Sequence, residues 1–115
     1  MATMNLTKQD FIAKVADYTS ENWVMKGQRP AVIDFYAEWC GPCRRLLQLV
    51  EKFSEEYAGL IDVYKVNVDE EEGLADDFRV HTIPTLLFVP LEGEPWRLQG
   101  VLSQSILKDG FERLL

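Results

Sequence analysis

The sequence predicts an α/β fold with a central mixed β-sheet of four to five strands and helices on both faces. An apolar run at 31–37 and an alternating segment at 61–68 predict two central strands, each followed by a segment with helical periodicity. Strands linked through a helix pair in parallel by right-handed crossovers. Two later strands, at 85–89 and 96–101, are joined only by residues 90–93, and so short a connection predicts an antiparallel hairpin. The sheet is therefore expected to be mixed.

The length and the charge of the chain limit what it can be. Its 115 residues fit one domain spanning 1–115. Its 19 acidic and 12 basic residues give a net charge of −7, which would repel nucleic acid and anionic membrane surfaces. No apolar stretch of about 18 residues predicts a membrane-spanning helix, and residues 1–10 lack the apolar core of a signal peptide. We expect a cytoplasmic monomer, or a periplasmic one if a leader has been trimmed away.

The N-terminal segment predicts a helix over 7–18. Thr7 is a candidate N-cap, with Asp10 three residues later. Apolar side chains then recur at helical spacing, namely Phe11, Ile12, Val15 and Tyr18. Residues 19–30 form a polar connection, and residues 4–6 could add an edge strand in front of the helix.

The next two elements are a buried strand and a helix. Residues 31–37 are apolar and rich in β-formers apart from Asp34, as expected of a strand covered on both faces. A helix is predicted over 41–57, because Pro42 is tolerated in a first turn and Gly59 would end the helix. Its inner stripe consists of Leu46, Leu47, Val50, Phe53 and Tyr57.

The second half of the chain continues the alternation. A second central strand at 61–68 precedes a short helix at 70–78, whose acidic start suits the positive end of a helix dipole. Strands at 85–89 and 96–101 follow, and Ser103 is a candidate N-cap for the last helix. The apolar stripe of that helix is expected to be Ile106, Leu107, Phe111, Leu114 and Leu115.

The two cysteines, Cys40 and Cys43, are three positions apart. A disulfide across so short a loop would remove little chain entropy, so a purely structural bridge is disfavoured. A structural zinc site needs four ligands, and the only histidine is His81, so no metal is expected. We expect His81 to be a surface residue. The alternative to chemistry is packing, since a free cysteine behaves as a small buried apolar side chain.

The place of the cysteines, between a buried strand and a helix start, favours dithiol chemistry. The thiolate is the form that attacks a disulfide, and a helix N-terminus stabilises it through free N–H groups and a partial positive charge. Cys40 lies at that N-terminus and is expected to be the attacking nucleophile. Cys43, about one turn further on and more buried, is expected to resolve the mixed disulfide.

The segment 39–43, Trp-Cys-Gly-Pro-Cys, resembles the active-site pentapeptide of the thioredoxin family. The resemblance extends to residues 34–38 in front of it, to Ile-Pro-Thr at 83–85, which is similar to the family's cis-proline loop, and to Gly100 beside the site. It covers residues 30–115. It implies the thioredoxin fold and a protein-disulfide oxidoreductase whose only redox group is its own cysteine pair, with no other cofactor.

The Gly41–Pro42 dipeptide implies the reducing direction, because relatives that act as oxidants usually carry other residues there, often histidine. The resemblance then implies an electron carrier that reduces disulfides in client proteins, is restored by a thioredoxin reductase and helps to maintain cell redox homeostasis. Two other functions stay open. The chain could be a binding module whose cysteines are incidental, or an oxidase or isomerase with a higher reduction potential.

Asp34 is the one charged residue in the apolar strand. A buried carboxylate is costly unless it is partnered or protonated, and burial would raise its pKa. An edge position facing solvent would avoid this cost. The resemblance implies instead a buried aspartate that accepts the proton of Cys43 through a water. Lys65 either matches the family's lysine near this aspartate or simply faces solvent.

Pro84 precedes a predicted strand. Base rates favour a trans peptide bond before a proline, but the resemblance implies a cis bond and a proline that packs against the cysteines. The backbone of Ile83 would then be free to pair with an extended segment of a substrate. The expected substrate groove is formed by small or apolar residues, namely Trp39, Gly41, Pro42, Ile83, Gly100 and Val101.

The helix after the cysteines departs from the family pattern at two places. Many members have a proline that kinks this helix, and here the aligned position is Gln48, which predicts a straighter helix. Arg44 and Arg45 replace a common lysine–aliphatic pair, and the charge of Arg44 is expected to favour the thiolate.

Overall fold

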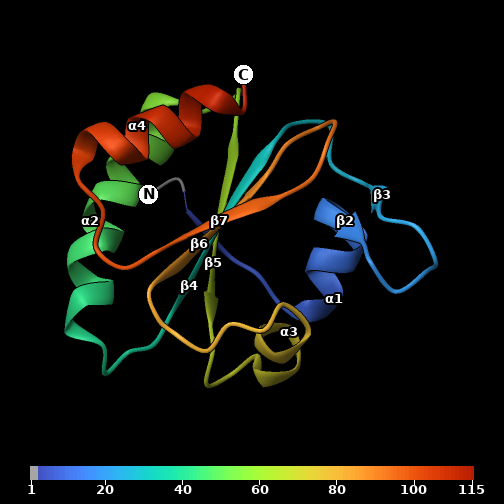
Figure 1. The fold of residues 1–115 in the computed structure, drawn as a ribbon, viewed down its shortest axis with the longest axis horizontal. Coiled ribbons are helices and arrows are strands. Elements are labelled where there is room, and N and C mark those ends of the chain that lie inside the picture. Colours follow the sequence, from blue (N-terminus) through green and yellow to red (C-terminus); the bar gives the residue numbers. More distant parts are fainter. Residues whose placement is uncertain (1–2) are drawn as a thin grey trace.

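A five-stranded mixed sheet forms the centre of the computed structural model, which describes residues 3–115 (Figure 1). The strands lie in the order β1-β5-β4-β6-β7. β4 pairs in parallel with β5 and antiparallel with β6, so the predicted mixed sheet is confirmed. Their bounds are Met4–Asn5 for β1, Ala31–Tyr36 for β4, Asp62–Asn67 for β5, Thr85–Val89 for β6 and Trp96–Gln99 for β7.

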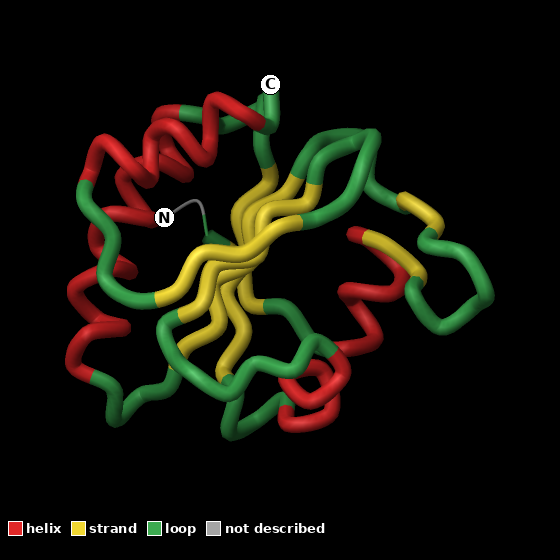
Figure 2. The backbone as a smooth tube through the Cα atoms, viewed as in Figure 1, coloured by secondary structure: helices red, strands yellow, loops and turns green. Residues whose placement is uncertain are grey.

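Helices cover both faces of this sheet, as Figures 1 and 2 show. One face carries α2 (Gly41–Glu56) and α4 (Gln104–Arg113). The other carries α1 (Lys8–Asp10), which continues as a π-helix over Phe11–Val15, together with α3 (Glu72–Asp77). None of the helices described has the length and apolarity that a bilayer crossing requires.

The alternation of side chains along β4 creates two cores. Ile33 and Phe35 pack toward the π-helix and α3, whereas Val32 packs toward α2 and α4. By the same period of two, Asp34 points to the side of Val32 and therefore toward α2. The central strand thus carries a carboxylate into the layer that also holds the helix of the cysteines.

The expected helix over 7–18 is right at its start and wrong at its end. Thr7 is the N-cap: its hydroxyl accepts from the Asp10 backbone N at 3.0 Å, and Asp10 completes a capping box. After Val15 the chain is extended at Ala16, and β2 (Ala16–Asp17) pairs antiparallel with β3 (Val24–Met25). The expected polar connection therefore contains a short hairpin.

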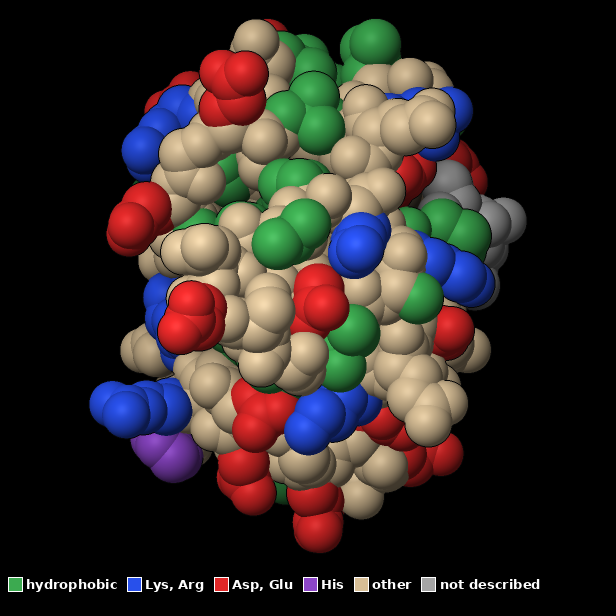
Figure 3. Space-filling model, turned by 90° about the vertical axis from the view of Figure 1, so that its right-hand side faces the viewer, with side chains coloured by type: hydrophobic (Ala, Val, Ile, Leu, Met, Phe, Trp, Pro, Cys, Tyr) green, Lys and Arg blue, Asp and Glu red, His purple; other side chains and the backbone are tan. Residues whose placement is uncertain are grey.

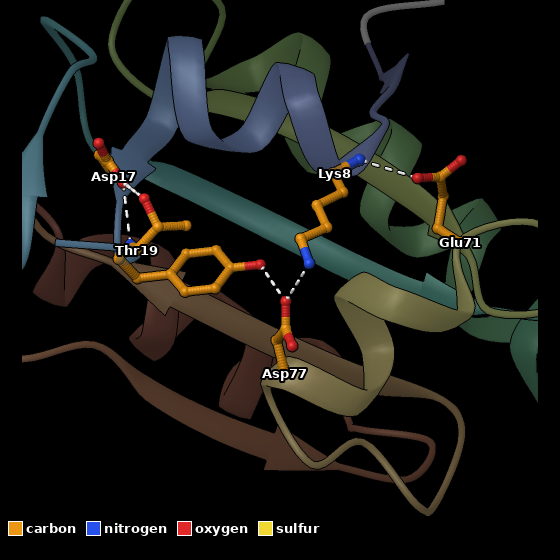
Figure 4. A network of polar contacts seen from close by, with 6 residues as sticks. Lys8, Asp17, Thr19, Glu71 and Asp77 are labelled. Atoms are coloured by element: carbon orange, nitrogen blue, oxygen red, sulfur yellow. Dashed lines mark hydrogen bonds and ion pairs between the residues drawn. The ribbon is translucent and has the colours of Figure 1, made fainter.

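A polar network fastens this N-terminal segment to α3 (Figure 4). The Lys8 ammonium lies 2.8 Å from the Asp77 carboxylate, and the Tyr18 hydroxyl donates to the same oxygen at 2.6 Å. The Lys8 backbone N donates to Glu71 at 2.8 Å. The bonds from the Lys8 ammonium and the Tyr18 hydroxyl hold the pKa of Asp77 below its usual range. The bond to Glu71 ties the first helix to the loop that follows β5.

The C-terminal elements differ from expectation in two details. β7 ends at Gln99 rather than at residue 101, because Gly100 takes a φ of +87°, which breaks the strand. Ser103 is the N-cap of α4, as predicted, but Ile106 and Leu115 are exposed. Gly110 occupies the inner face in their place, where a Cβ would lie only 2.7 Å from the Phe88 ring.

Candidate functional site

The two cysteines meet where β4 gives way to α2. Cys40 is the N-cap of α2, and its Sγ accepts from the Cys43 backbone N at 3.2 Å. A disulfide joins the two residues, whose Cα atoms are 5.2 Å apart. Pro42 sits in the first turn, where an N–H would have no helical partner. Sulfur at this position therefore takes the place of the oxygen that usually caps a helix.

Burial separates the two sulfur-bearing residues only slightly. Cys40 is 5% exposed and Cys43 is 1% exposed, so Cys43 is the deeper of the two, in the order that the sequence predicts. Ala37 is buried with them, and Tyr36 and Ile83 pack against this cluster. The disulfide therefore lies in an apolar setting, at the end of the central strand.

The loop before β6 reaches the cysteines through Ile83. The Ile83–Pro84 peptide bond is cis, as the resemblance implies, and Pro84 is buried. The carbonyl of Pro84 accepts from the Gly100 backbone N at 2.9 Å, so the loops at the ends of β6 and β7 are held together. Within residues 3–115 the structure shows no hydrogen bond to the backbone of Ile83.

Two apolar side chains of the expected groove are open to solvent. Trp39 is 69% exposed and Val101 is 52% exposed. The Trp39 indole N–H donates to the Asp69 carboxylate at 2.9 Å, which orients the ring. Gly41 is partly exposed, and the guanidinium groups of Arg44 and Arg45 would lie within 4 Å of a Cβ placed there.

Asp34 lies in the middle of the sheet and is fully buried. The alternative that Asp34 faces solvent at a sheet edge is wrong, because β4 has a paired strand on both sides, β5 and β6. Neither carboxylate oxygen has a hydrogen-bond partner among the described residues. Burial raises the pKa of Asp34 to about 7; the charge of Lys65 acts to lower it and that of Glu51 to raise it.

Lys65 stands opposite Asp34 in the parallel pairing of β4 with β5. It is half-buried rather than simply facing solvent. Together with Cys43 it lines a cavity of about 270 Å³, whose remaining walls are Tyr36, Ala37, Glu38, Arg44 and Leu47. The cavity therefore connects the surroundings of the deeper cysteine with those of the Asp34–Lys65 position.

Comparison with known proteins fixes the family. The family model described as Thioredoxin matches residues 3–113. The chain belongs to the thioredoxin family. The thioredoxin of Borreliella burgdorferi is 42% identical over 113 residues, which cover 97% of this chain and 93% of that protein. Thioredoxin 1 of Nostoc sp. is 40% identical over 103 residues, which cover 90% of this chain and 96% of that protein.

A solved structure shares the fold. Chloroplastic thioredoxin z matches with a TM-score of 0.81 at 23% identity, covering 99% of this chain and 95% of its own. Thioredoxins are disulfide oxidoreductases, and Cys40 with Cys43 is the redox-active pair through which this one exchanges dithiol and disulfide.

Two features of this thioredoxin bear on the sequence-based expectations. α2 runs as one helix through Gln48, so no proline interrupts it after the cysteines. The second feature is a residue that sequence reasoning missed. Glu51 has both carboxylate oxygens buried without a hydrogen-bond partner among the described residues. Its spacing of eight residues from Cys43 puts it on the same helical stripe, which is the signal that could have found it.

Within the described part of the chain, no group of three or more His, Cys, Asp or Glu side chains is arranged to hold a metal ion. His81 is exposed, in the connection that leads to Ile83.

Proposed function

We propose that this thioredoxin is a protein-disulfide reductase and electron carrier that reduces client proteins and maintains cell redox homeostasis in the cytoplasm. The capping bond from the Cys43 backbone N to Cys40 Sγ carries the assignment of Cys40 as the nucleophile of dithiol exchange, because the same N–H would stabilise its thiolate after reduction. The Gly41–Pro42 dipeptide adds no charge that would make the pair more oxidising. The protein acts as a monomer, needs no added cofactor and is restored by a thioredoxin reductase.

The first chemical step belongs to Cys40. Its thiolate attacks one sulfur of a client disulfide, and a Cys40–client disulfide forms. The other client sulfur leaves with the electron pair of the broken bond and takes up a proton. The partial positive charge at the start of α2 favours the attacking thiolate, and so does the nearby guanidinium of Arg44.

The second step belongs to Cys43 and Asp34. Cys43 loses its proton to the Asp34 carboxylate, and its sulfur then attacks Cys40 Sγ, which expels the client as a thiolate. A carboxyl group with a pKa of about 7 suits this task, because it can accept and release a proton near neutral pH. The cavity between Cys43 and Lys65 gives room for a water that would carry the proton.

Client binding uses backbone pairing and an apolar surface. An extended segment of the client pairs with the backbone of Ile83, which Pro84 leaves without a sheet partner. The exposed apolar side chains of Trp39 and Val101 would tolerate many client sequences. The proposed groove consists of Trp39, Gly41, Pro42, Ile83, Gly100 and Val101.

Reduction of insulin disulfides by cysteine variants tests the proposal. Cys40→Ser is expected to abolish turnover, because the nucleophile is lost. Cys43→Ser is expected to abolish turnover too, and to accumulate a mixed disulfide with the client, because the second step cannot follow. Turnover that survives in Cys40→Ser would refute the assignment of the nucleophile.

The reduction potential of the Cys40–Cys43 couple tests the direction of electron flow. We expect about −270 mV, a value characteristic of thioredoxin itself rather than derived from this site. A potential near those of oxidases, about −120 mV, would reject a reductase and favour the oxidising alternative.

A further inference from the structure

Glu51 is a buried carboxylate that the proposed mechanism does not use. It lies on α2, and both of its side-chain oxygens are buried without a hydrogen-bond partner among the described residues. Leaving such a group unpaired inside a protein costs free energy, so its position calls for an explanation. Its backbone carbonyl, by contrast, accepts from the Ser54 hydroxyl at 2.6 Å.

The helix places Glu51 in line with the resolving cysteine. Cys43, Leu47 and Glu51 are spaced four residues apart and therefore share one face of α2. Cys43 and Leu47 both line the cavity that also contains Lys65. Glu51 thus lies beyond Leu47, in the layer between α2 and the sheet into which Asp34 points.

Two carboxyl groups that have no hydrogen-bond partner among residues 3–115 therefore enter one layer from opposite sides, Asp34 from β4 and Glu51 from α2. The other groups that face Asp34 are Lys65 from β5 and, along β4 itself, the phenol of Tyr36. The neighbour of Asp34 on β6 is the apolar Leu86. In the part of the chain that the structure describes, the ammonium group of Lys65 thus acts on Asp34 in opposition to the carboxylate of Glu51.

We propose that Glu51 is a positioning residue for the resolution step, where its negative charge offsets that of Lys65 and keeps Asp34 basic enough to take the proton of Cys43. This inference rests on the proposed role of Asp34. With Lys65 alone beside it, the Asp34 carboxylate would be stabilised and would be a weaker base. Glu51 acts through Asp34 rather than on the client or the sulfur atoms.

The balance of the step is unchanged by Glu51. The Cys43 S–H bond breaks, its proton passes to a carboxylate oxygen of Asp34, and the sulfur keeps the electron pair that forms the Cys40–Cys43 bond. Glu51 forms and breaks no bond in this scheme. Its contribution is the field that it imposes on Asp34 across a poorly hydrated layer, where charges interact strongly.

The test follows the titration of Asp34 directly, by the NMR shift of its carboxyl carbon in the oxidised and reduced protein. Glu51→Gln keeps the shape of the side chain and removes its charge, so the Asp34 midpoint is expected to fall by on the order of one pH unit. Lys65→Met removes the opposite charge and is expected to raise that midpoint. Glu55→Gln, an exposed glutamate one turn further along α2, is the matched control and should leave the midpoint unchanged.

A kinetic readout separates this inference from the proposed function. The acidic limb of the pH profile of insulin reduction should move down with the Asp34 midpoint in Glu51→Gln, and Glu51→Gln should add nothing in an Asp34→Asn background. If Asp34→Asn changes the profile but Glu51→Gln does not move it, the role of Glu51 is rejected and that of Asp34 stands. If Asp34→Asn leaves the profile intact, the proposed role of Asp34 fails first.

Discussion

At the scale of single residues, burial decides the chemistry of Asp34. The same carboxyl group would titrate near pH 3.8 in the open, and its pKa is about 7 inside the sheet. Sequence alone indicated a costly carboxylate in a predicted central strand, but left open whether Asp34 faced solvent at an edge position. Pairing on both sides of β4 settles the burial, and the layer under α2 supplies the neighbouring charges.

The raised pKa of Asp34 predicts how stability depends on pH. Between about pH 4 and pH 7 the native protein keeps this proton and the unfolded chain releases it, so the free energy of unfolding falls as the pH rises. This decrease in the free energy of unfolding is complete above pH 7 and amounts to at most about 4 kcal/mol. Asp34→Asn should therefore stabilise the oxidised protein at pH 8 and change it little at pH 4.

Urea unfolding of the oxidised protein at the two pH values measures this difference. Asp109→Asn, at an exposed position on α4, is the control and should show no such dependence on pH. If Asp34→Asn changed the free energy of unfolding equally at pH 4 and pH 8, the raised pKa of Asp34 would be contradicted.

At the scale of elements, sequence predicted the long segments well and the short ones poorly. β4 and α2 followed from a continuous apolar run and from an apolar stripe at helical spacing. The hairpin of β2 and β3 was missed because two-residue strands are too short to show a period. Glu51 was missed for another reason: a glutamate on a helix usually faces solvent, and only the packing of α2 on the sheet buries this one.

The contact of α4 with β6 predicts the effect of a single methyl group. In Gly110→Ala the new Cβ would lie 2.7 Å from the Phe88 ring, which is itself stacked on Trp96 with 5.2 Å between ring centroids. The ring has little room to move, so we expect a net destabilisation of about 1–3 kcal/mol despite the better helix propensity of alanine. Thermal or urea unfolding measures it.

Gly73→Ala on α3 is the matched control for this substitution. Its Cβ would meet the flexible Lys8 side chain at 3.7 Å, an ordinary contact, so the variant should be stabilised by roughly 0.5–1 kcal/mol. The opposite signs of the two changes distinguish close packing from helix propensity. A stabilising Gly110→Ala would show that the Phe88 ring moves freely.

At the scale of the whole molecule, one sheet contributes to two hydrophobic cores and positions the redox-active cysteine pair. Each face of the sheet is covered by its own helices, and the cysteines lie at the end of the strand that both cores share. Charge is spread unevenly on the outside: acidic side chains gather at the lower end of the face in Figure 3, at the level of α3, among scattered basic and small apolar patches. A net charge of −7 favours solubility.

The shared sheet predicts that residues 1–115 unfold as one domain. Trp23 packs against one core and Trp96 against the other, so each reports on a different face. Variants that keep only Trp23 or only Trp96 should each give a fluorescence transition in urea that coincides with the far-UV circular dichroism of the same variant. Separate transitions for the two faces would show that the cores unfold independently.

The hairpin of β2 and β3 has a practical use. Figure 1 shows it on the side of the molecule away from the start of α2, and its connecting residues, among them Ser20, Glu21 and Asn22, are exposed. Exposed connections of this kind tolerate added sequence. A peptide tag or a fluorescent label inserted there would lie far from the disulfide. The hairpin is therefore a suitable site for attaching this protein to a surface without blocking disulfide exchange.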